Sequence, residues 1–158
     1  MPLSNSQEHL VIMKDLLRSA KLKVTPLRIA VLECLFDAAR PLSHGEIQSL
    51  LPDLDRVTLY RILASFEEGD IAHQVQGLDG AWRFCAHIKE GGECPGNHPH
   101  FLCSKCGIML CLTDQSMPRV NVPEGYSVSG KQFVVYGFCP DCSGEASENG
   151  NVKPEEAR

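Results

Sequence analysis

The chain has 158 residues, of which 43% are hydrophobic, and a net charge of −5, so it can form one medium domain or two small ones. This acidic balance gives no sign of a nucleic-acid binder by bulk charge, and no stretch approaches the ~20 apolar residues of a membrane span. We expect no signal peptide and a cytoplasmic location, where the eight cysteines would be metal ligands or redox centres rather than disulfides.

The N-terminal part is predicted to begin with three helices. Apolar residues at helical spacing indicate a helix over 7–20. Thr25 is placed to cap a second helix that has Pro26 at its first position, where the missing N–H costs nothing. Ser43 followed by Glu46 has the spacing of a capping box at the start of a third helix.

A fourth helix and a β-hairpin are predicted to follow. Asp55 is the expected cap of the helix and Gly69 its expected end, and its apolar residues are expected to form a buried face: Val57, Leu59, Ile62, Leu63 and Phe66. Two short extended runs then flank "GLDG" at 77–80, which is typical of a hairpin turn. Helices followed by a hairpin are the element order of a winged helix-turn-helix, predicted here over residues 1–87.

The periodicity changes in the C-terminal part. Residues 88–97 are rich in glycine and are predicted to be a hinge loop. Strands are expected in "HFLC", "GIMLCL" and "YSVSGKQFVVYGFC", with at most a short helix between them, broken by Pro118. We therefore predict a small α/β domain over 98–142 in a protein of the α+β class. Residues 143–158 are polar and are predicted to be a disordered tail.

Two C-x-x-C pairs are the densest metal-binding pattern in the sequence: Cys103 with Cys106, and Cys139 with Cys142. Two intervening residues let both thiolates of a pair turn toward one cation, and four sulfurs match the closed tetrahedral site that zinc prefers. The rival interpretation is a thiol redox pair, which a single C-x-x-C at a helix N-terminus would favour. We expect a structural zinc site, with no open position for catalysis.

Further histidines and cysteines predict a second, different metal site. His98 and His100 alternate, so in an extended segment both side chains point to the same face. Alone, each histidine is more often a satisfied polar residue, but together with thiols from both domains they form a candidate N/S site: His73, Cys85, His98, His100 and Cys111. Such a site would fix the orientation of the two domains, as a switch requires, and its ligand types suit zinc. Cys94, in the loop, is a spare ligand, a redox-sensitive thiol or a residue without a role.

The sequence also resembles a known family. The motifs "VTPLRIAVLECL", "RVTLYRILASFEEGDIAH", "WRF", "HPHFLCSKCG" and "VYGFCPDC", in this order, are similar to those of the ferric uptake regulator (Fur) superfamily of bacterial metal-dependent repressors. The resemblance covers about residues 10–142. It implies a winged helix that binds double-stranded operator DNA, and a C-terminal domain that forms a homodimer. It also implies that the fourth helix contacts DNA through four residues: Arg56, Thr58, Tyr60 and Arg61. Arg28 matches the family position that usually contacts the DNA backbone.

The resemblance is strongest to the zinc uptake regulators (Zur) of that superfamily. Iron sensors tend to carry Glu at the end of the hairpin strand and zinc sensors carry Cys, and this chain has Cys85. His73 matches a further ligand position, and zinc sensors differ in which histidine of the His98/His100 region completes the site. Cys111 is an additional candidate. The resemblance implies a repressor of metal-uptake genes that is active when zinc fills this regulatory site.

Other functions were weighed against the zinc-dependent repressor. An iron, nickel or peroxide sensor belongs to the same superfamily, although a peroxide sensor would need a carboxylate ligand at the iron site. A zinc hydrolase or thiol oxidoreductase would need an open metal position and a general base, and no H-E-x-x-H pattern is present. A plain zinc-ribbon module would leave the helix "DRVTLYRILASF" and the hairpin unexplained. We therefore expect no enzyme, no small-molecule substrate and no membrane partner.

Overall fold

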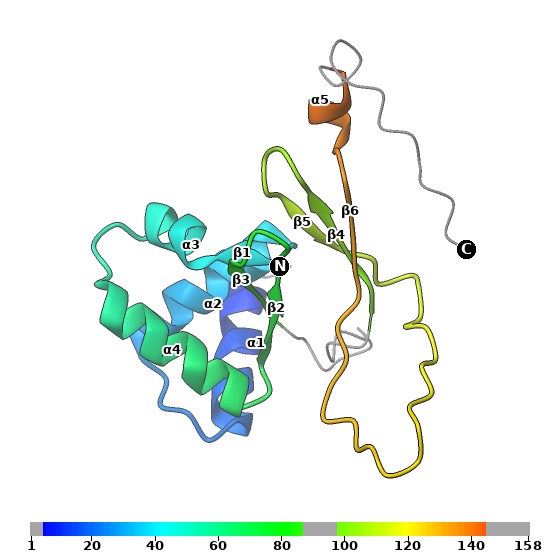
Figure 1. The fold of residues 1–158 in the computed structure, drawn as a ribbon. Helices are drawn as coiled ribbons and strands as arrows, with labels where there is room; N and C mark the ends of the chain where they lie inside the picture. Colours follow the sequence, from blue (N-terminus) through cyan, green and yellow to red (C-terminus); the bar gives the residue numbers. More distant parts are fainter. Residues whose placement is uncertain (1–4, 87–97, 145–158) are drawn as a thin grey trace.

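The computed structural model describes residues 5–86 and 98–144, here called the N-terminal unit and the C-terminal unit (Figure 1). The predicted hinge 88–97, with Cys94, and all but the first two residues of the predicted tail lie outside the described residues. The N-terminal unit contains α1 (Asn5–Ser19), α2 (Pro26–Ala38), β1 (Leu42–Ser43), α3 (His44–Leu50), α4 (Arg56–Glu68), β2 (Ala72–Gln76) and β3 (Trp82–Ala86). The C-terminal unit contains β4 (His100–Cys103), β5 (Met109–Cys111), β6 (Val134–Gly137) and α5 (Pro140–Ser143).

The predicted helix caps are present. The Thr25 side chain accepts a hydrogen bond from the backbone N–H of residue 28, at 3.3 Å. Ser43 and Glu46 form both hydrogen bonds of a capping box, which satisfies two donors at the start of α3. The Asp55 carboxylate accepts from the N–H of Thr58 at 2.9 Å, and α4 ends at Gly69 as expected.

The helices of the N-terminal unit enclose one hydrophobic core. Leu17 of α1, Leu32 and Leu35 of α2, and Leu59 and Phe66 of α4 are almost completely buried in it. The prediction for α4 holds for four of its five apolar residues, but Val57 is 59% exposed rather than buried. Val57 lies two residues before Leu59, about 200° around the helix, and therefore faces away from the core.

Each unit contains a three-stranded sheet. In the N-terminal unit the order is β1-β3-β2, and the antiparallel hairpin of β2 and β3 pairs residues 72–76 with 82–86. In the C-terminal unit β4 lies between β5, which is antiparallel to it, and β6, which is parallel. The strand expected over 126–139 is shorter than predicted, since only Val134–Gly137 pairs, and residues 112–133 form neither helix nor strand.

The two units share a second, small hydrophobic cluster. Val75 of β2 packs with Leu102 of β4 and Met109 of β5, and Val134 of β6 covers them. The Gln132 side chain also pairs with the backbone of Gln76, accepting from its N–H at 3.2 Å and donating to its carbonyl at 2.6 Å. The sheets are thus held against each other by apolar and polar contacts. No helix in the described part of the chain is long and apolar enough to cross a membrane.

Candidate metal centres and nucleic-acid surface

The four C-x-x-C thiols lie together at one end of the C-terminal sheet. Cys103 ends β4, and Cys139 follows β6. Because β4 and β6 are parallel, with Cys103 opposite Gly137, their C-terminal ends lie at the same edge of the sheet. The four sulfur atoms, from Cys103, Cys106, Cys139 and Cys142, lie within 4.8 Å of one another.

The spacing of these sulfurs fits a tetrahedral zinc ion. Zn–S bonds of about 2.3 Å in a tetrahedron place the sulfurs about 3.8 Å apart. The sulfurs of Cys106 and Cys139 are 3.8 Å apart, and the backbone N–H of Cys139 donates to the Cys103 sulfur at 3.4 Å. Four thiol ligands match a closed site that supports folding rather than catalysis.

Backbone hydrogen bonds prepare one of these thiols for metal binding. The N–H of Cys106, followed by that of Cys139, lowers the pKa of Cys103 to about 6. The hydrogen bond with Cys139 raises the pKa of Cys142 to about 12. Four negative sulfurs do not coexist at neutral pH without a cation, so metal binding must displace protons, and acid weakens the site.

Three of the five residues of the predicted second site meet between the two sheets, and its two thiols form a close pair of their own. The ring nitrogens of His73, His98 and His100 lie within 4.8 Å of one another, and the latter two side chains are 3% and 2% exposed. Cys85 lies directly across from His73 in the hairpin, and Cys111 lies directly across from His100 in the β4–β5 ladder. Cross-strand partners point to the same face of a sheet, so each unit offers one imidazole and one thiol to the other.

Two short distances within these pairs are those expected between ligands of one zinc ion. The Nε2 atoms of His73 and His100 are 3.5 Å apart, and the sulfurs of Cys85 and Cys111 are 3.6 Å apart. A tetrahedral zinc ion places two nitrogen ligands about 3.3 Å apart and two sulfur ligands about 3.8 Å apart. The ring centroid of His98 lies 4.6 Å from that of His100, so this histidine is a further candidate ligand. These residues would hold the ion without a carboxylate.

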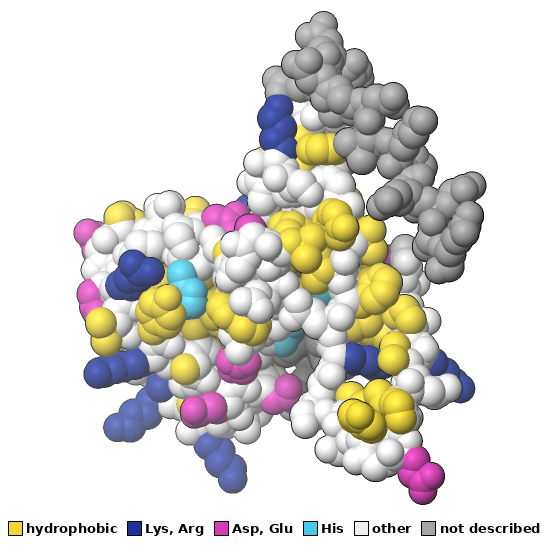
Figure 2. Space-filling view, viewed as in Figure 1, with side chains coloured by type: hydrophobic (Ala, Val, Ile, Leu, Met, Phe, Trp, Pro, Cys, Tyr) yellow, Lys and Arg dark blue, Asp and Glu magenta, His cyan; other side chains and the backbone are white. Residues whose placement is uncertain are grey.

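The candidate DNA-contacting residues lie mostly on the outer face of α4. Arg56, Tyr60 and Arg61 are exposed there, and Thr58 is half-buried beside them. Arg28, on α2, is half-buried and donates to the carbonyl of Lys23 at 2.9 Å. In Figure 2, Lys and Arg side chains project from the α4 side of the N-terminal unit, whereas hydrophobic side chains form several patches on the C-terminal unit.

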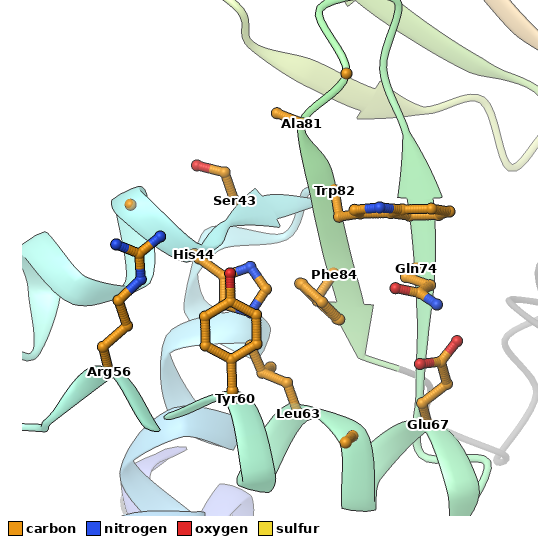
Figure 3. A pocket seen from close by; sticks show the side chains of 13 residues that line it. Ser43, His44, Arg56, Tyr60, Leu63, Glu67, Gln74, Ala81, Trp82 and Phe84 are labelled. Atoms are coloured by element: carbon orange, nitrogen blue, oxygen red, sulfur yellow. The ribbon is translucent and has the colours of Figure 1, made fainter. Parts of the chain in front are cut away.

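A residue outside the predicted set holds the tyrosine of this face in place. The His44 ring stacks on Tyr60 with ring centroids 3.9 Å apart, and its other neighbour is Phe84, edge-on at 4.8 Å. Burial, and then the charge of Arg56, lowers the pKa of His44. These side chains line a pocket of about 520 Å³ between α4 and the hairpin, which Trp82 also lines (Figure 3). His44 was missed because a lone histidine after a helix cap gives no signal in sequence.

Arg83 is the second residue that sequence reasoning did not single out. It is 4% exposed, and its guanidinium group contacts the Asp79 carboxylate in its own hairpin and the Gly107 carbonyl in the other unit. A buried charge with partners in two units has a structural task, because leaving it unpaired would be costly. The motif "WRF" contains it, but nothing in the sequence shows what it contacts.

Comparisons with known proteins place these features among transcriptional regulators. No family model matches the chain. The transcriptional regulator FurA of Mycobacterium tuberculosis is 27% identical over 135 residues, which cover 80% of this chain and 87% of that protein. The peroxide-responsive repressor PerR of Staphylococcus aureus is 27% identical over 137 residues, covering 80% of this chain and 86% of PerR.

One solved structure is similar along almost the whole chain. It is a zinc uptake regulator complexed with zinc and DNA, with a TM-score of 0.63 and 17% identity. The match covers 92% of this chain and 99% of that chain. At this identity the likeness establishes the fold, a mixed α and β structure of the same kind.

Substitutions in the two thiol clusters are expected to have different effects on metal content. Cys139→Ser should lose the ion of the C-x-x-C site and destabilise the C-terminal unit, because metal-binding energy at a structural site is folding energy. Cys85→Ser should keep that ion and the fold but lose the ion between the sheets. Metal analysis per chain and circular dichroism would measure both. Cys34→Ser, in α2 outside both clusters, is the control and should retain both ions. Equal loss of fold in both test variants would contradict a division into two sites.

Proposed function

We propose that the chain is a member of the ferric uptake regulator superfamily of transcriptional regulators and that it is a zinc-dependent repressor. In this proposal a homodimer in the cytoplasm binds palindromic operator DNA when its regulatory site is filled, and thereby controls metal-uptake genes. In the same proposal, the chain is divided into a DNA-binding domain over 1–87, a hinge over 88–97, and a dimerisation and metal-binding domain over 98–142. The proteins it resembles are transcriptional regulators rather than enzymes.

The observation that carries the proposal is the origin of the ligands in the second cluster. His73 and Cys85 come from the hairpin of the N-terminal unit, and His98, His100 and Cys111 come from the C-terminal unit. An ion bound here holds the two units at one angle, and its loss releases them. A ligand shifts such an equilibrium only if it binds one arrangement better, and this site is complete only when the units are docked.

The donor set favours zinc as the regulatory metal. Imidazole and thiolate ligands suit zinc, whereas a peroxide-sensing iron site needs a carboxylate. In the described part of the chain, neither metal-ligand cluster includes an Asp or Glu. Four thiols, Cys103, Cys106, Cys139 and Cys142, would hold a second, structural zinc. The alternative is an iron, nickel or peroxide sensor, and the similarity to the peroxide-responsive repressor PerR is an argument for the last of these.

The DNA-binding step follows from α4 and its surroundings. A helix with exposed Arg56, Tyr60 and Arg61 offers a cationic and aromatic face for base edges and phosphates, with Thr58 beside them. Arg28 would contact the backbone from α2. In a dimer, two such helices must lie about one helical turn of DNA apart, ~34–36 Å, so the angle set by the regulatory ion decides whether both fit.

The edge of the C-terminal sheet is suited to pairing with a second copy. β6 lies at the edge of its sheet, and Val135, Tyr136 and Phe138 are 44%, 63% and 52% exposed. More exposed apolar side chains precede the strand: Val120, Val122, Tyr126, Val128 and Phe133. An exposed patch of this kind marks an interface, and an edge strand is a template for pairing with another strand.

Zinc is expected to increase operator affinity more than iron does. Titration of purified, metal-stripped protein with each metal, followed by fluorescence anisotropy of a labelled operator, would measure this under anaerobic conditions. Cys85→Ser should lose the response to zinc, because the site between the sheets is then incomplete. Tighter binding with iron alone would reject the zinc proposal and leave the iron-sensor alternative.

Arg61→Ala is expected to lower operator affinity of the zinc-loaded protein about tenfold, since contacts of this type are worth about 1–3 kcal/mol. The matched control is Arg18→Ala, because Arg18 is equally exposed but lies on α1, where it pairs with Asp15. Filter binding at fixed salt would compare the two variants with the wild type. Equal losses for both arginines would indicate that only overall charge matters.

Tyr136→Asp is expected to convert the dimer to a monomer and to weaken operator binding, because it places a charge at the proposed interface. Leu78→Asp is the control, since Leu78 is 66% exposed but lies at the tip of the hairpin. Sedimentation velocity would give the mass of each variant. A dimer that persists in Tyr136→Asp would place the interface elsewhere.

A further inference from the structure

A buried arginine connects the hairpin to the C-x-x-C site by a route that contains no metal ligand. Nη1 of Arg83 donates to Oδ1 of Asp79 at 3.0 Å, and its Nη2 donates to Oδ2 at 2.7 Å. The same Nη2 donates to the carbonyl of Gly107, at 2.9 Å, in the C-terminal unit. One guanidinium group therefore bridges the turn of the hairpin and the turn that follows the first cysteine pair.

The Gly107 carbonyl has a position that depends on the cysteine pair. Gly107 follows Cys106 directly, and its N–H donates to the carbonyl of Cys103 at 2.9 Å. The next N–H, of Ile108, hydrogen-bonds to the Cys106 sulfur, and the Ile108 carbonyl accepts from the N–H of Cys103 at 2.9 Å. Gly107 has a φ of +75°, which side-chain-bearing residues rarely adopt. The turn that presents this carbonyl is thus built around two of the four thiols.

The hairpin is shaped to accept the same guanidinium group. A Cβ at Gly77 would lie 2.5 Å from Nη1 of Arg83 and 2.5 Å from Oδ1 of Asp79, so a side chain there would displace this ion pair. A Cβ at Gly107 would lie 3.3 Å from Nη2. The hydrogen bonds from Arg83 lower the pKa of Asp79 to about 2, so this carboxylate is ionised at neutral pH. Both turns therefore close around Arg83.

We propose that Arg83 is a positioning residue that transmits the state of the C-x-x-C site to the hairpin and so to the DNA-binding face. This inference rests on the proposed function and adds to it, because the four-thiol site then contributes to operator affinity as well as to folding. When those thiols hold their ion, the turn at Gly107 is fixed and Arg83 is anchored at both ends. The hairpin is then preset at the angle at which the ligands between the sheets meet.

The test compares Arg83→Met with wild type in the full-length protein, with and without zinc. Methionine keeps an unbranched apolar side chain but removes the hydrogen bonds to Asp79 and Gly107. Arg40→Met is the matched control, because Arg40 also pairs with a carboxylate, Glu46, at 2.9 Å and donates to a carbonyl, that of Pro41, at 3.1 Å. Both of its partners lie within the N-terminal unit.

The chain supplies its own probe for the hairpin. Trp82 is the single tryptophan, precedes Arg83 on β3, and is 42% exposed. Its emission therefore reports the hairpin without DNA. In the Cys85→Ser background, where the site between the sheets cannot fill, zinc added to stripped protein should still shift Trp82 emission. Arg83→Met in the same background should abolish that shift, whereas Arg40→Met should leave it.

Operator binding gives the second readout. Arg83→Met should reduce the affinity of the zinc-loaded protein about tenfold and leave that of the zinc-free protein unchanged, as expected for lost coupling between sites. An equal loss of operator affinity in the zinc-loaded and zinc-free protein, or no loss in either, would overturn the proposal. So would a zinc-dependent shift of Trp82 emission that Arg83→Met leaves unchanged. If Arg83→Met does not fold, Asp79→Asn replaces it, because this variant keeps the guanidinium group but weakens its anchor. Asp79→Asn should show a smaller loss of operator affinity, confined to the zinc-loaded protein. If operator affinity is not lost in that state, the proposal is also overturned. A wild type that gains no operator affinity with zinc would instead count against the proposed function, and the Trp82 result would still stand.

Discussion

The contact between the two sheets is the constraint on which the rest of the structure depends. Among the described residues, the C-terminal unit has little hydrophobic core of its own, since Leu102 and Met109 are buried against Val75 of the other unit. So small a core is not expected to hold a domain together without help from metal ions or a partner. The four thiols meet at one end of this sheet and the imidazoles at its contact with the hairpin. Folding, metal binding and the angle between units are therefore linked.

Strand pairing explains why the ligands form two sites rather than one. Parallel pairing of β4 with β6 brings the two cysteine pairs to one edge of the sheet. Antiparallel pairing of β4 with β5 places Cys111 across from His100, facing the hairpin. A single stretch, 98–111, thus supplies ligands to both clusters. One cluster lies within a unit, and the other lies between units.

Much of this could be predicted from sequence because the signals were local. The caps at Thr25, Ser43 and Asp55 and the hairpin around "GLDG" depend on residues a few positions apart, and all are present. The two C-x-x-C pairs also gave a strong signal, because their spacing limits the chemistry they suit. Val57 is apolar but exposed, because it lies two residues before Leu59 and so on the opposite side of α4 from the core. The roles of His44 and Arg83 depend on contacts made far along the chain, which no spacing encodes.

The Gln132 side chain has a consequence for how molecules of this protein behave in a crowded solution. β2 is the outer strand of its sheet, and outer strands with unpaired backbone groups invite other chains to add to them. The carboxamide of Gln132 occupies both the N–H and the carbonyl of Gln76, as another peptide group would. The chain thereby blocks its own sheet against unwanted strand addition on the hairpin side, while β6 keeps an open edge. A loss of docking between the units would expose the backbone of Gln76 on β2.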